Sequence, residues 1–240
     1  EQARGALRRQ DLLQSVQLTE AASYEQERSR GYLTTQEGAL HFVAEQLQRQ
    51  GRIADGVTLG RRLHDADGRW NARTLKLIYP FPYRETIERH ARENSLSPHL
   101  VAALIRQESM FNPSAKSAAG AVGLMQVMPK TGRSVAGRLG IKRFTPQHLT
   151  DPEINVRIGA AHFRHLMSEH ENQLEHVIAA YNAGATSVSR WRGMHKDKDR
   201  QLFSERIPYA ETREYVKILV RNTMMYELLY PAQSNPEITI

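Results

Sequence analysis

Helical periodicity runs through most of this sequence and constrains its fold more than any other feature. Apolar residues return at i, i+3, i+4 and i+7, a spacing that places them on one face of an α-helix. Residues 4–50 and 53–64 are also rich in good helix formers. In the rest of the chain the pattern predicts helices at 84–94, 98–110, 130–138, 152–169, 173–183 and 210–229. We therefore expect a mainly α fold.

Short motifs predict where several of these helices begin or end. Ser97 and Asp151 are each followed by proline, which pairs an N-cap side chain with a residue suited to the first helical turn. Thr34 and Glu37 have the spacing of a capping box. Gly51 is placed to end the helix that begins there.

The motif "YPFPY" at 79–83 interrupts the helical pattern, because its two prolines exclude a continuous helix. We place a domain boundary near Lys76, so that residues 1–75 form a helical segment and residues 76–240 a second domain. Within the second domain, the glycine-broken segment 114–129 is too short for a long helix. We expect a loop with a small β-hairpin there.

Composition narrows the possible functions. The chain of 240 residues has no cysteine, which excludes disulfides, thiolate metal sites and a cysteine nucleophile. The sequence contains no run of about 18 apolar residues, so it predicts no transmembrane helix. The net charge is +7, and residues 76–240 hold most of it, with 22 Lys and Arg against 16 acidic residues. This balance favours an anionic partner, but the basic residues are scattered, so we do not expect nucleic-acid binding.

Two carboxylates and a phenol lie on otherwise apolar helix faces. Glu108 takes the i+7 position of one stripe, Tyr181 takes the same position of another, and Glu211 lies one turn before Tyr215. Burial raises the pKa of a carboxyl, and a protonated carboxyl in an apolar cleft can act as a general acid. The alternative is structural: a helix-end glutamate turned to solvent, a core tyrosine, and a surface charge network around Glu211.

Other catalytic motifs are missing from the sequence. The segment "GAVG" is not followed by Gly-Lys-Ser/Thr, so it is not a phosphate-binding loop, and there is no "GxSxG" nucleophile motif. His162 and His165 lie three residues apart, but neither "HExxH" nor "HxxEH" occurs. We therefore expect no metal site and no cofactor.

An ordered series of motifs resembles one known family. The motifs are "IRQES" at 105–109, "FNP" at 111–113, "KS" at 116–117, "GLMQVMP" at 123–129, "DPEINVRIG" at 151–159, "AAYNAG" at 179–184 and "RIPYAETREYV" at 206–216. In this order they resemble the soluble lytic transglycosylases, which have a goose-type lysozyme-like catalytic domain. The resemblance covers residues 78–230 well, and residues 1–75 resemble, more loosely, the last helices of the α-superhelical domain that precedes it. The pair His162-Phe163 departs from the family's usual Tyr-Leu.

The resemblance implies a reaction and a set of site residues. The family cleaves the β-1,4 bond between N-acetylmuramic acid and N-acetylglucosamine in peptidoglycan without water, and leaves a 1,6-anhydromuramic end. Glu108 is implied as the single acid and base, Tyr181 as the residue that hydrogen-bonds and orients it, and Asn182 as a support beside it. The implied substrate contacts are Ser117, Gln126, Met128 and Glu211. No metal or other cofactor is implied.

The same resemblance implies a location and partners. We expect a bacterial cell-envelope protein, periplasmic or associated with the outer membrane, that binds glycan strands, with the stem peptide and other cell-wall enzymes as further candidates. The chain begins at Glu1, so we expect a processed form or part of a longer protein. Two alternatives stay open: a goose-type lysozyme that transfers to water, and a non-catalytic wall-binding or assembly module. The presence of Glu108, Tyr181 and Gln126 argues against the second.

Overall fold

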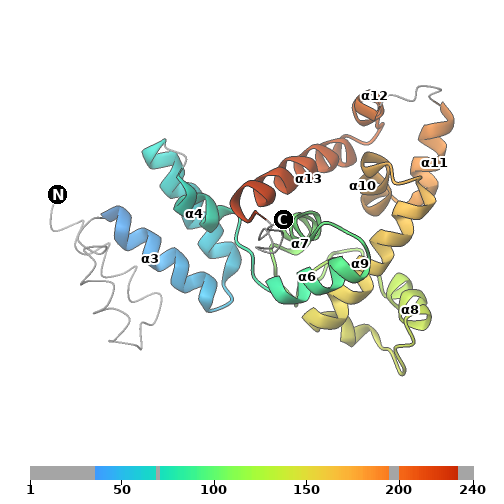
Figure 1. The fold of residues 1–240 in the computed structure, drawn as a ribbon, viewed down its shortest axis with the longest axis horizontal. Coiled ribbons are helices and arrows are strands. Elements are labelled where there is room, and N and C mark those ends of the chain that lie inside the picture. The colour runs from blue at the N-terminus through green and yellow to red at the C-terminus, as the bar shows by residue number, and fades with distance from the viewer. Residues whose placement is uncertain (1–35, 69–70, 195–199, 232–240) are drawn as a thin grey trace, which may run out of the picture. The chain divides into compact units, whose positions relative to one another are not determined.

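The structure is a computed structural model of the chain, and it describes residues 36–68, 71–194 and 200–231 (Figure 1). Within these residues the regular elements are helices. They fall into two compact units, Glu1–Phe81 and Pro82–Ile240.

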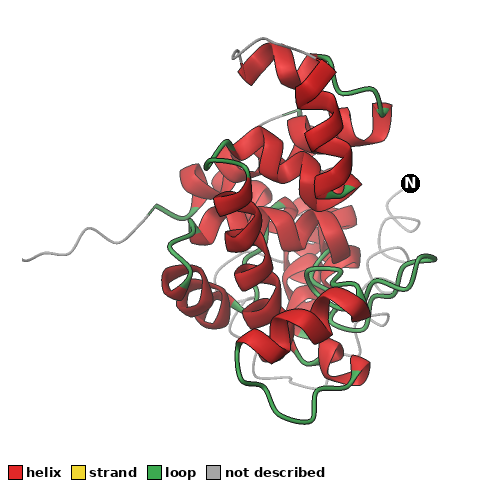
Figure 2. Cartoon of the chain, turned by 90° about the vertical axis from the view of Figure 1, so that its right-hand side faces the viewer, coloured by secondary structure: helices red, strands yellow, loops and turns green. Residues whose placement is uncertain are grey.

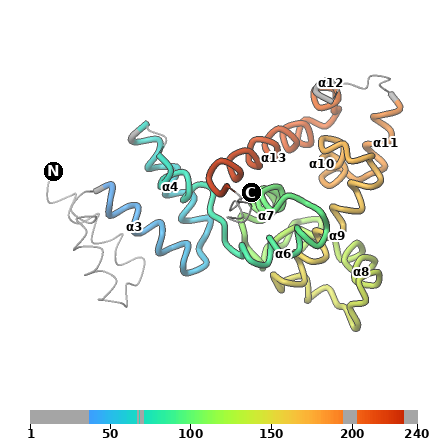
Figure 3. Tube along the Cα trace, in the orientation of Figure 1, coloured from blue at the N-terminus to red at the C-terminus, as the bar shows by residue number. Residues whose placement is uncertain are grey.

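The first unit consists of helices that pack against one another through a few buried apolar side chains. Ala44, Leu63 and Leu77, one from each helix, form a buried cluster. A hydrogen bond of 2.9 Å between His41 Nε2 and the Thr74 hydroxyl joins the first helix to the third. The described helices, drawn in blue to cyan in Figure 3, are α3 (Gln36–Arg49), α4 (Ile53–Asp67) and α5 (Ala72–Ile78).

The predictions for this part of the chain have different outcomes. The helix predicted after Gly51 is confirmed as α4, whereas α5 was not predicted. The capping box cannot be followed, because Thr34 lies outside the described residues. The boundary expected near Lys76 falls inside α5, and the two units divide within "YPFPY". The interpretation of residues 1–75 as the end of an α-superhelical domain stays a prediction.

The second unit contains most of the helices and is seen from another side in Figure 2. The six helices predicted for this part of the sequence are confirmed, with ends that agree to within one residue, whereas η2, α11 and α12 were not predicted. In chain order the elements are α6 (Arg84–Glu93), α7 (Pro98–Ser109), α8 (Pro129–Arg138), η2 (Pro146–Thr150), α9 (Pro152–Glu169), α10 (Leu174–Ala183), α11 (Ala185–Met194), α12 (Arg200–Glu205) and α13 (Ala210–Leu229).

Both helix starts predicted for this unit are present. Ser97 precedes α7, and its hydroxyl oxygen accepts a hydrogen bond from the Leu100 backbone N–H at 3.4 Å. Asp151 precedes α9, and its Oδ1 accepts one from the Ile154 N–H at 2.9 Å. Proline follows each cap, where a backbone N–H would have no helical partner in any case. These caps set where the two central helices of the unit begin.

Helix α7 lies at the centre of the second unit (Figure 1). Every residue from Leu100 to Arg106 is buried, so this helix is covered on all sides rather than along one stripe. Ala102 and Ala103 lie on the side of the helix that faces away from the larger apolar residues. Both are fully buried, and their small side chains let neighbouring elements pack closely. The one-sided burial predicted for this helix is therefore wrong. Helix α13 packs against α7 and buries Leu219 in the same core.

The small β-hairpin expected within 114–129 is not formed. This segment holds two isolated antiparallel bridges, Lys116 with Val122 and Val122 with Val127. The second pair closes a tight turn through two backbone hydrogen bonds of 3.1 and 3.0 Å. The ladder cannot extend further, because Pro129 has no backbone N–H and begins α8 directly after the turn.

Gly159 lets the loop between α7 and α8 lie directly against α9. A Cβ at this position would be 2.3 Å from the Met125 Sδ and 2.8 Å from the Met125 Cβ. Gly159→Ala should therefore lower the free energy of unfolding by about 1–3 kcal/mol, because the backbone that carries Met125 must move away. Urea unfolding of the purified variant measures this loss.

Gly137→Ala is the matched control for that substitution. Gly137 also lies in a helix, α8, but a Cβ there would meet nothing within 4 Å. Removing a helical glycine at an open position should raise the free energy of unfolding by about 0.5–1 kcal/mol. If both alanine variants were as stable as the parent chain, the close approach of loop and helix would not be what Gly159 provides.

Candidate active site

Glu108 lies at the C-terminal end of α7, where the chain turns out of the core. The helix ends at Ser109, and the next two residues, Met110 and Phe111, both have left-handed backbones with φ of 50° and 60°. The Ser109 hydroxyl donates to the Leu124 carbonyl oxygen at 2.8 Å. This contact ties the helix end to the following loop, so Glu108 is held at the junction between them.

Tyr215 of α13 donates a hydrogen bond from its hydroxyl to Oε1 of Glu108. Burial raises the pKa of Glu108 to about 7, although the hydrogen bond from Tyr215 acts in the opposite direction. Burial and the neighbouring Glu108 charge raise the pKa of Tyr215 well above 10, so the phenol stays protonated and keeps donating. A carboxyl with a pKa near 7 is present in both forms at neutral pH, which suits a group that first donates and then accepts a proton.

Tyr181 makes a different contact from the expected one. The resemblance implied a hydrogen bond from Tyr181 to Glu108, but the Tyr181 hydroxyl donates to the Met125 carbonyl oxygen at 2.7 Å. Burial and the Glu108 charge raise the pKa of Tyr181 well above 10, which places its phenol near that carboxyl. Tyr215 makes the bond to Glu108 instead, because α13 packs against α7 whereas Tyr181, from α10, reaches the loop.

Asn155 of α9 holds the loop between α7 and α8 in place. Its side chain is fully buried: Oδ1 accepts from the Met125 backbone N–H at 2.8 Å, and Nδ2 donates to the carbonyl oxygens of Val122 and Leu149 at 2.9 and 2.7 Å. A buried amide with these partners acts as an internal cross-link. A Cβ at Gly123, where φ is +81°, would lie 2.1 Å from the Leu149 oxygen, so glycine is required there.

Three predicted substrate contacts, Ser117, Gln126 and Met128, come from this loop. Gln126 has a left-handed backbone, with φ of 46°, and its side-chain amide donates to the Gly123 carbonyl oxygen at 2.9 Å. Met128 is 42% exposed, which is high for a large apolar side chain. Both residues line a pocket that lies beside the loop, whereas Ser117 does not. The Ser117 hydroxyl oxygen accepts from the Ala121 N–H at 3.0 Å within its own turn.

Of the other two predicted site residues, Asn182 lines the pocket and Glu211 does not. Asn182 Oδ1 accepts a hydrogen bond of 2.7 Å from the Thr212 hydroxyl, which joins α10 to the start of α13, and Asn182 also lines the pocket. Glu211 is exposed in the first turn of α13 and is not among the lining residues. The geometry therefore groups Asn182 with Tyr181 and does not place Glu211 in this pocket.

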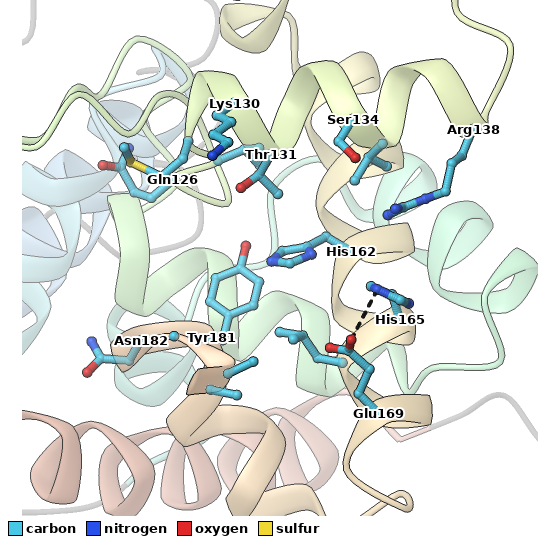
Figure 4. A pocket seen from close by; sticks show the side chains of 17 residues that line it. Gln126, Lys130, Thr131, Ser134, Arg138, His162, His165, Glu169, Tyr181 and Asn182 are labelled. Atoms are coloured by element: carbon cyan, nitrogen blue, oxygen red, sulfur yellow. Dashed lines mark ion pairs between the residues drawn. The ribbon is translucent and has the colours of Figure 1, made fainter. Parts of the chain in front are cut away.

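The pocket has a volume of about 550 Å³ and opens between the loop, α8, α9 and α10 (Figure 4). Gln126, Tyr181 and Asn182 line one side, and side chains of α8 and α9 line the other. Glu108 is not among the lining residues. Tyr181 does line the pocket, and the charge of Glu108 raises its pKa, so the Glu108 carboxyl lies near the Tyr181 side of the pocket. Among the described residues no group of three or more His, Cys, Asp or Glu is arranged to hold a metal ion.

Two residues of this site were not identified from the sequence. Tyr215 was recognised as part of a helix face but not as the partner of Glu108, and Asn155 was not singled out. A polar residue between Ile154 and Val156, on a helix that begins at Pro152, was the available signal for a buried amide.

Comparison with known proteins gives a consistent result. Residues 85–204 match the family model described as Transglycosylase SLT domain. The chain is 36% identical over 158 residues to the soluble lytic murein transglycosylase of Salmonella typhimurium, which covers 65% of this chain and 24% of that protein. It is 32% identical over 157 residues to the membrane-bound lytic murein transglycosylase C of Sodalis glossinidius, with coverage of 56% and 43%.

Solved structures show the same architecture. The 70-kDa soluble lytic transglycosylase in complex with bulgecin A superposes with a TM-score of 0.72 at 29% identity, covering 82% of this chain and 31% of that one. An inactive glutamate-to-glutamine mutant of lytic transglycosylase Slt from Pseudomonas aeruginosa superposes with a TM-score of 0.67 at 28% identity, covering 91% and 37%.

The family model spans half of the sequence, and this chain belongs to the Transglycosylase SLT domain family. The resemblance inferred from the motifs is thereby confirmed, as is the fold class, a mainly α lysozyme-like catalytic domain. The chain spans about a quarter of the length of the soluble relatives it matches, 24% in each of two cases.

Asn155→Asp tests whether the buried amide organises the loop. Aspartate keeps an acceptor oxygen but loses both donors, so the carbonyl oxygens of Val122 and Leu149 would face a buried carboxylate. We expect the free energy of unfolding to fall by about 2–4 kcal/mol. Asn172→Asp is the control, because Asn172 is exposed and its side chain accepts one hydrogen bond from the residues that the structure describes, that of Arg164 at 3.5 Å. Equal losses in both variants, measured by urea unfolding, would contradict the assignment.

The burial of Glu108 also predicts how stability changes with pH. Its pKa is about 7 in the folded chain against 4.5 for an exposed glutamate, so between these values the folded state binds more protons and stability falls as pH rises. Glu108→Gln removes this ionisation. Relative to the parent chain, the variant should gain on the order of 3 kcal/mol between about pH 4.5 and pH 7. Denaturant unfolding at several pH values measures the gain, with Glu211→Gln as the exposed control. A difference that does not change with pH would contradict a buried Glu108 carboxyl.

Proposed function

We propose that this chain is the catalytic part of a peptidoglycan lytic transglycosylase, which cleaves the β-1,4 bond between N-acetylmuramic acid and N-acetylglucosamine and leaves a 1,6-anhydromuramic end. The observation that carries the proposal is a largely buried carboxyl, Glu108, with a pKa of about 7 and a hydrogen bond from Tyr215. No second carboxylate is among the groups that shift this pKa. The names of the relatives, soluble and membrane-bound lytic murein transglycosylases, support the same reaction.

In the first step, protonated Glu108 donates its proton to the glycosidic oxygen. The bond from that oxygen to C1 of the muramic sugar breaks, the N-acetylglucosamine hydroxyl leaves, and positive charge develops at C1. Tyr215 orients the carboxyl throughout, because its own high pKa keeps the phenol a donor. That a glutamate-to-glutamine mutant of a structural relative is described as inactive supports a glutamate in this role.

In the second step, the Glu108 carboxylate accepts the proton of the C6 hydroxyl on the same muramic sugar. The C6 oxygen attacks C1, a new C–O bond closes the anhydro ring, and Glu108 is protonated again. Because the nucleophile belongs to the substrate, its proximity supplies a large effective concentration. The second carboxylate that most glycosidases use to attack C1 or to activate water is therefore not needed.

The roles proposed for the remaining residues rest on different observations. Tyr181 supports catalysis through the Met125 carbonyl, which keeps the loop beside Glu108, and Asn182 does so by joining α10 to α13. Gln126 and Met128 are proposed as glycan contacts because both line the pocket. For Ser117 and Glu211, the proposed substrate contacts rest on the resemblance of the sequence motifs.

We propose a place in the bacterial cell envelope, periplasmic or at the outer membrane, where glycan strands are the substrate. Relatives named soluble and membrane-bound both match this chain, which supports an envelope enzyme without choosing between the two locations. None of the helices in the described part of the chain is long and apolar enough to cross a membrane.

Product analysis of digested peptidoglycan tests the reaction. We expect muropeptides with anhydro ends, each lighter by one water than the hydrolysis product, and a loss of cleavage by about 10²–10⁴-fold in Glu108→Gln. Glu214→Gln, an exposed glutamate in α13, is the matched control and should cleave like the parent chain. Reducing ends in the mass spectra would show a lysozyme-type hydrolase that uses water. Full activity of a folded Glu108→Gln variant would exclude Glu108 as the acid.

A further inference from the structure

The ring of His90 in α6 lies between two carboxylates. It is 3% exposed, and its Nδ1 lies 2.8 Å from Oε2 of Glu93, about one turn further along the same helix. Its Nε2 lies 2.7 Å from Oε1 of Glu153, which belongs to α9. Helices α6 and α9 pack against each other (Figure 3). His90 therefore joins the two helices through polar contacts at both of its ring nitrogens.

Glu153 accepts hydrogen bonds from one face of α6. Thr86, Arg89 and His90 lie at i, i+3 and i+4, so their side chains point to the same side of the helix. The Thr86 hydroxyl donates to Oε2 of Glu153 at 3.3 Å, and the Arg89 guanidinium donates to the same oxygen. Burial acts to raise the pKa of Glu153, but the hydrogen bond and charge of His90, the charge of Arg89 and the Thr86 hydroxyl together lower it below the usual value of a glutamate. Glu153 is therefore a carboxylate at neutral pH.

Both contacts of the His90 ring are hydrogen bonds only when the imidazole carries a proton on each nitrogen. An ionised carboxylate accepts hydrogen bonds and has no proton to donate, whereas a neutral imidazole has one N–H and one bare nitrogen. A neutral ring would therefore turn a lone pair toward one of the two carboxylates. The arrangement suits the imidazolium, whose two N–H groups can each make a charge-assisted hydrogen bond.

The charged groups around this ring come from two helices. Glu93 and Arg89 belong to α6, and Glu153 belongs to α9. Helix α7 also packs against α6, but none of its described residues forms an ion pair or a hydrogen bond with the His90 ring. Two carboxylates and one guanidinium thus accompany the imidazole, and a positive charge on the ring makes this group of four side chains neutral.

The first turn of α9 connects this group to the loop between α7 and α8. Glu153 lies between Asp151, which caps the helix, and Asn155, whose backbone N–H donates to the Asp151 carbonyl oxygen at 2.9 Å. The Asn155 side chain in turn bonds to the backbone of Met125 and Val122 in the loop. Contacts that hold Glu153 against α6 therefore also hold Asn155, two residues later, against the loop.

We propose that His90 and Glu153 are positioning residues, which form an imidazolium–carboxylate joint that keeps the first turn of α9 in place. Through Asn155 this joint supports the loop, which presents Gln126 to the pocket near Glu108. The inference deepens the proposed function and rests on it for the reaction that the loop serves. Histidine side chains in general lose their second proton near pH 6.5. Once the ring is neutral, one carboxylate faces a bare nitrogen and the loop loses part of its support.

Amide hydrogen exchange tests the joint without substrate. The probe is the Met125 backbone N–H, which donates to Oδ1 of Asn155, and the measured quantity is its protection factor, the ratio of the intrinsic to the observed exchange rate. Glu108→Gln is the background chain, because it removes the ionisation of Glu108. In this background the protection factor should fall by about tenfold between pH 5.5 and pH 8, since one charge-assisted hydrogen bond is lost. Equal protection at both pH values would overturn the proposal.

Glu153→Gln in the same background tests the partner of the ring. The glutamine amide can donate to a bare imidazole nitrogen and its oxygen can accept from an N–H, so it can bond to the ring in either state. The protection factor should then change by less than about twofold between the two pH values. Glu88→Gln is the matched control and should keep the tenfold fall, because Glu88 pairs with Arg84 within α6. A tenfold fall that persisted in Glu153→Gln would show that another group titrates, and would overturn the assignment.

His90→Gln in the same background removes the titrating ring itself. The Met125 protection factor at pH 5.5 should drop to the value that the background chain has at pH 8, with no further decrease at the higher pH. Full protection in a folded His90→Gln chain would overturn the proposal. Because His90 is buried, this variant can fail to fold; Glu153→Gln then decides alone, since the Glu153 side chain is 46% exposed.

Cleavage of peptidoglycan at pH 5.5, with Glu108 intact, links the joint to the reaction. Glu153→Gln should lower kcat/KM by about tenfold because the loop is displaced, whereas Glu88→Gln should change it by less than about twofold. An unchanged kcat/KM in Glu153→Gln would overturn the positioning role. If the parent chain cut no glycan while the Met125 protection factor fell with pH as expected, the proposed function would fail and the joint would stand. If it cut glycan while the protection factor stayed equal, the joint alone would fail.

Discussion

The structure of the second unit depends on the removal of one carboxyl, that of Glu108, from water without a cation beside it. A neighbouring Lys or Arg would lower the pKa of Glu108 and hold it as a carboxylate, whereas burial raises that pKa to about 7 and the hydrogen bond from the neutral Tyr215 phenol opposes this rise only in part. Two features of the fold meet this requirement. Helix α7 is covered on all sides from Leu100 to Arg106, and α13 packs against it with Tyr215 at the level of the carboxyl.

The loop between α7 and α8 must also be rigid, although it contains no regular structure. Its backbone groups are bonded to side chains from other elements: Asn155 takes two of its peptide groups and Tyr181 a third. The loop is also held by close packing. Gly123 and Gly159 have no Cβ, so the loop can lie directly against Leu149, Asn155 and the backbone of α9. The loop can therefore present Gln126 to the pocket with a fixed, left-handed backbone.

Features governed by local sequence could be predicted, and features governed by packing between helices could not. Helix ends followed from caps such as Ser97 and Asp151, and the position of Glu108 on an apolar stripe followed from periodicity. The hydrogen bond to Glu108 from Tyr215 rather than Tyr181 could not be predicted, because both lie on buried faces and only the packing of α13 on α7 decides which phenol meets the carboxyl. The hairpin is missing partly for a similar reason: Pro129 stops the ladder locally, and the loop's peptide groups also bond to Asn155 of α9 and Tyr181 of α10.

Titration of the Glu108 carboxyl by carbon-13 NMR tests the central claim most directly. The resonance can be assigned by comparison of the parent chain with Glu108→Gln. Our account predicts a midpoint near pH 7, set by burial, and a still higher midpoint in Tyr215→Phe, where the hydrogen bond that lowers this pKa is lost. A midpoint at 4.5, the value of an exposed glutamate, would show that the carboxyl is hydrated and would contradict the account.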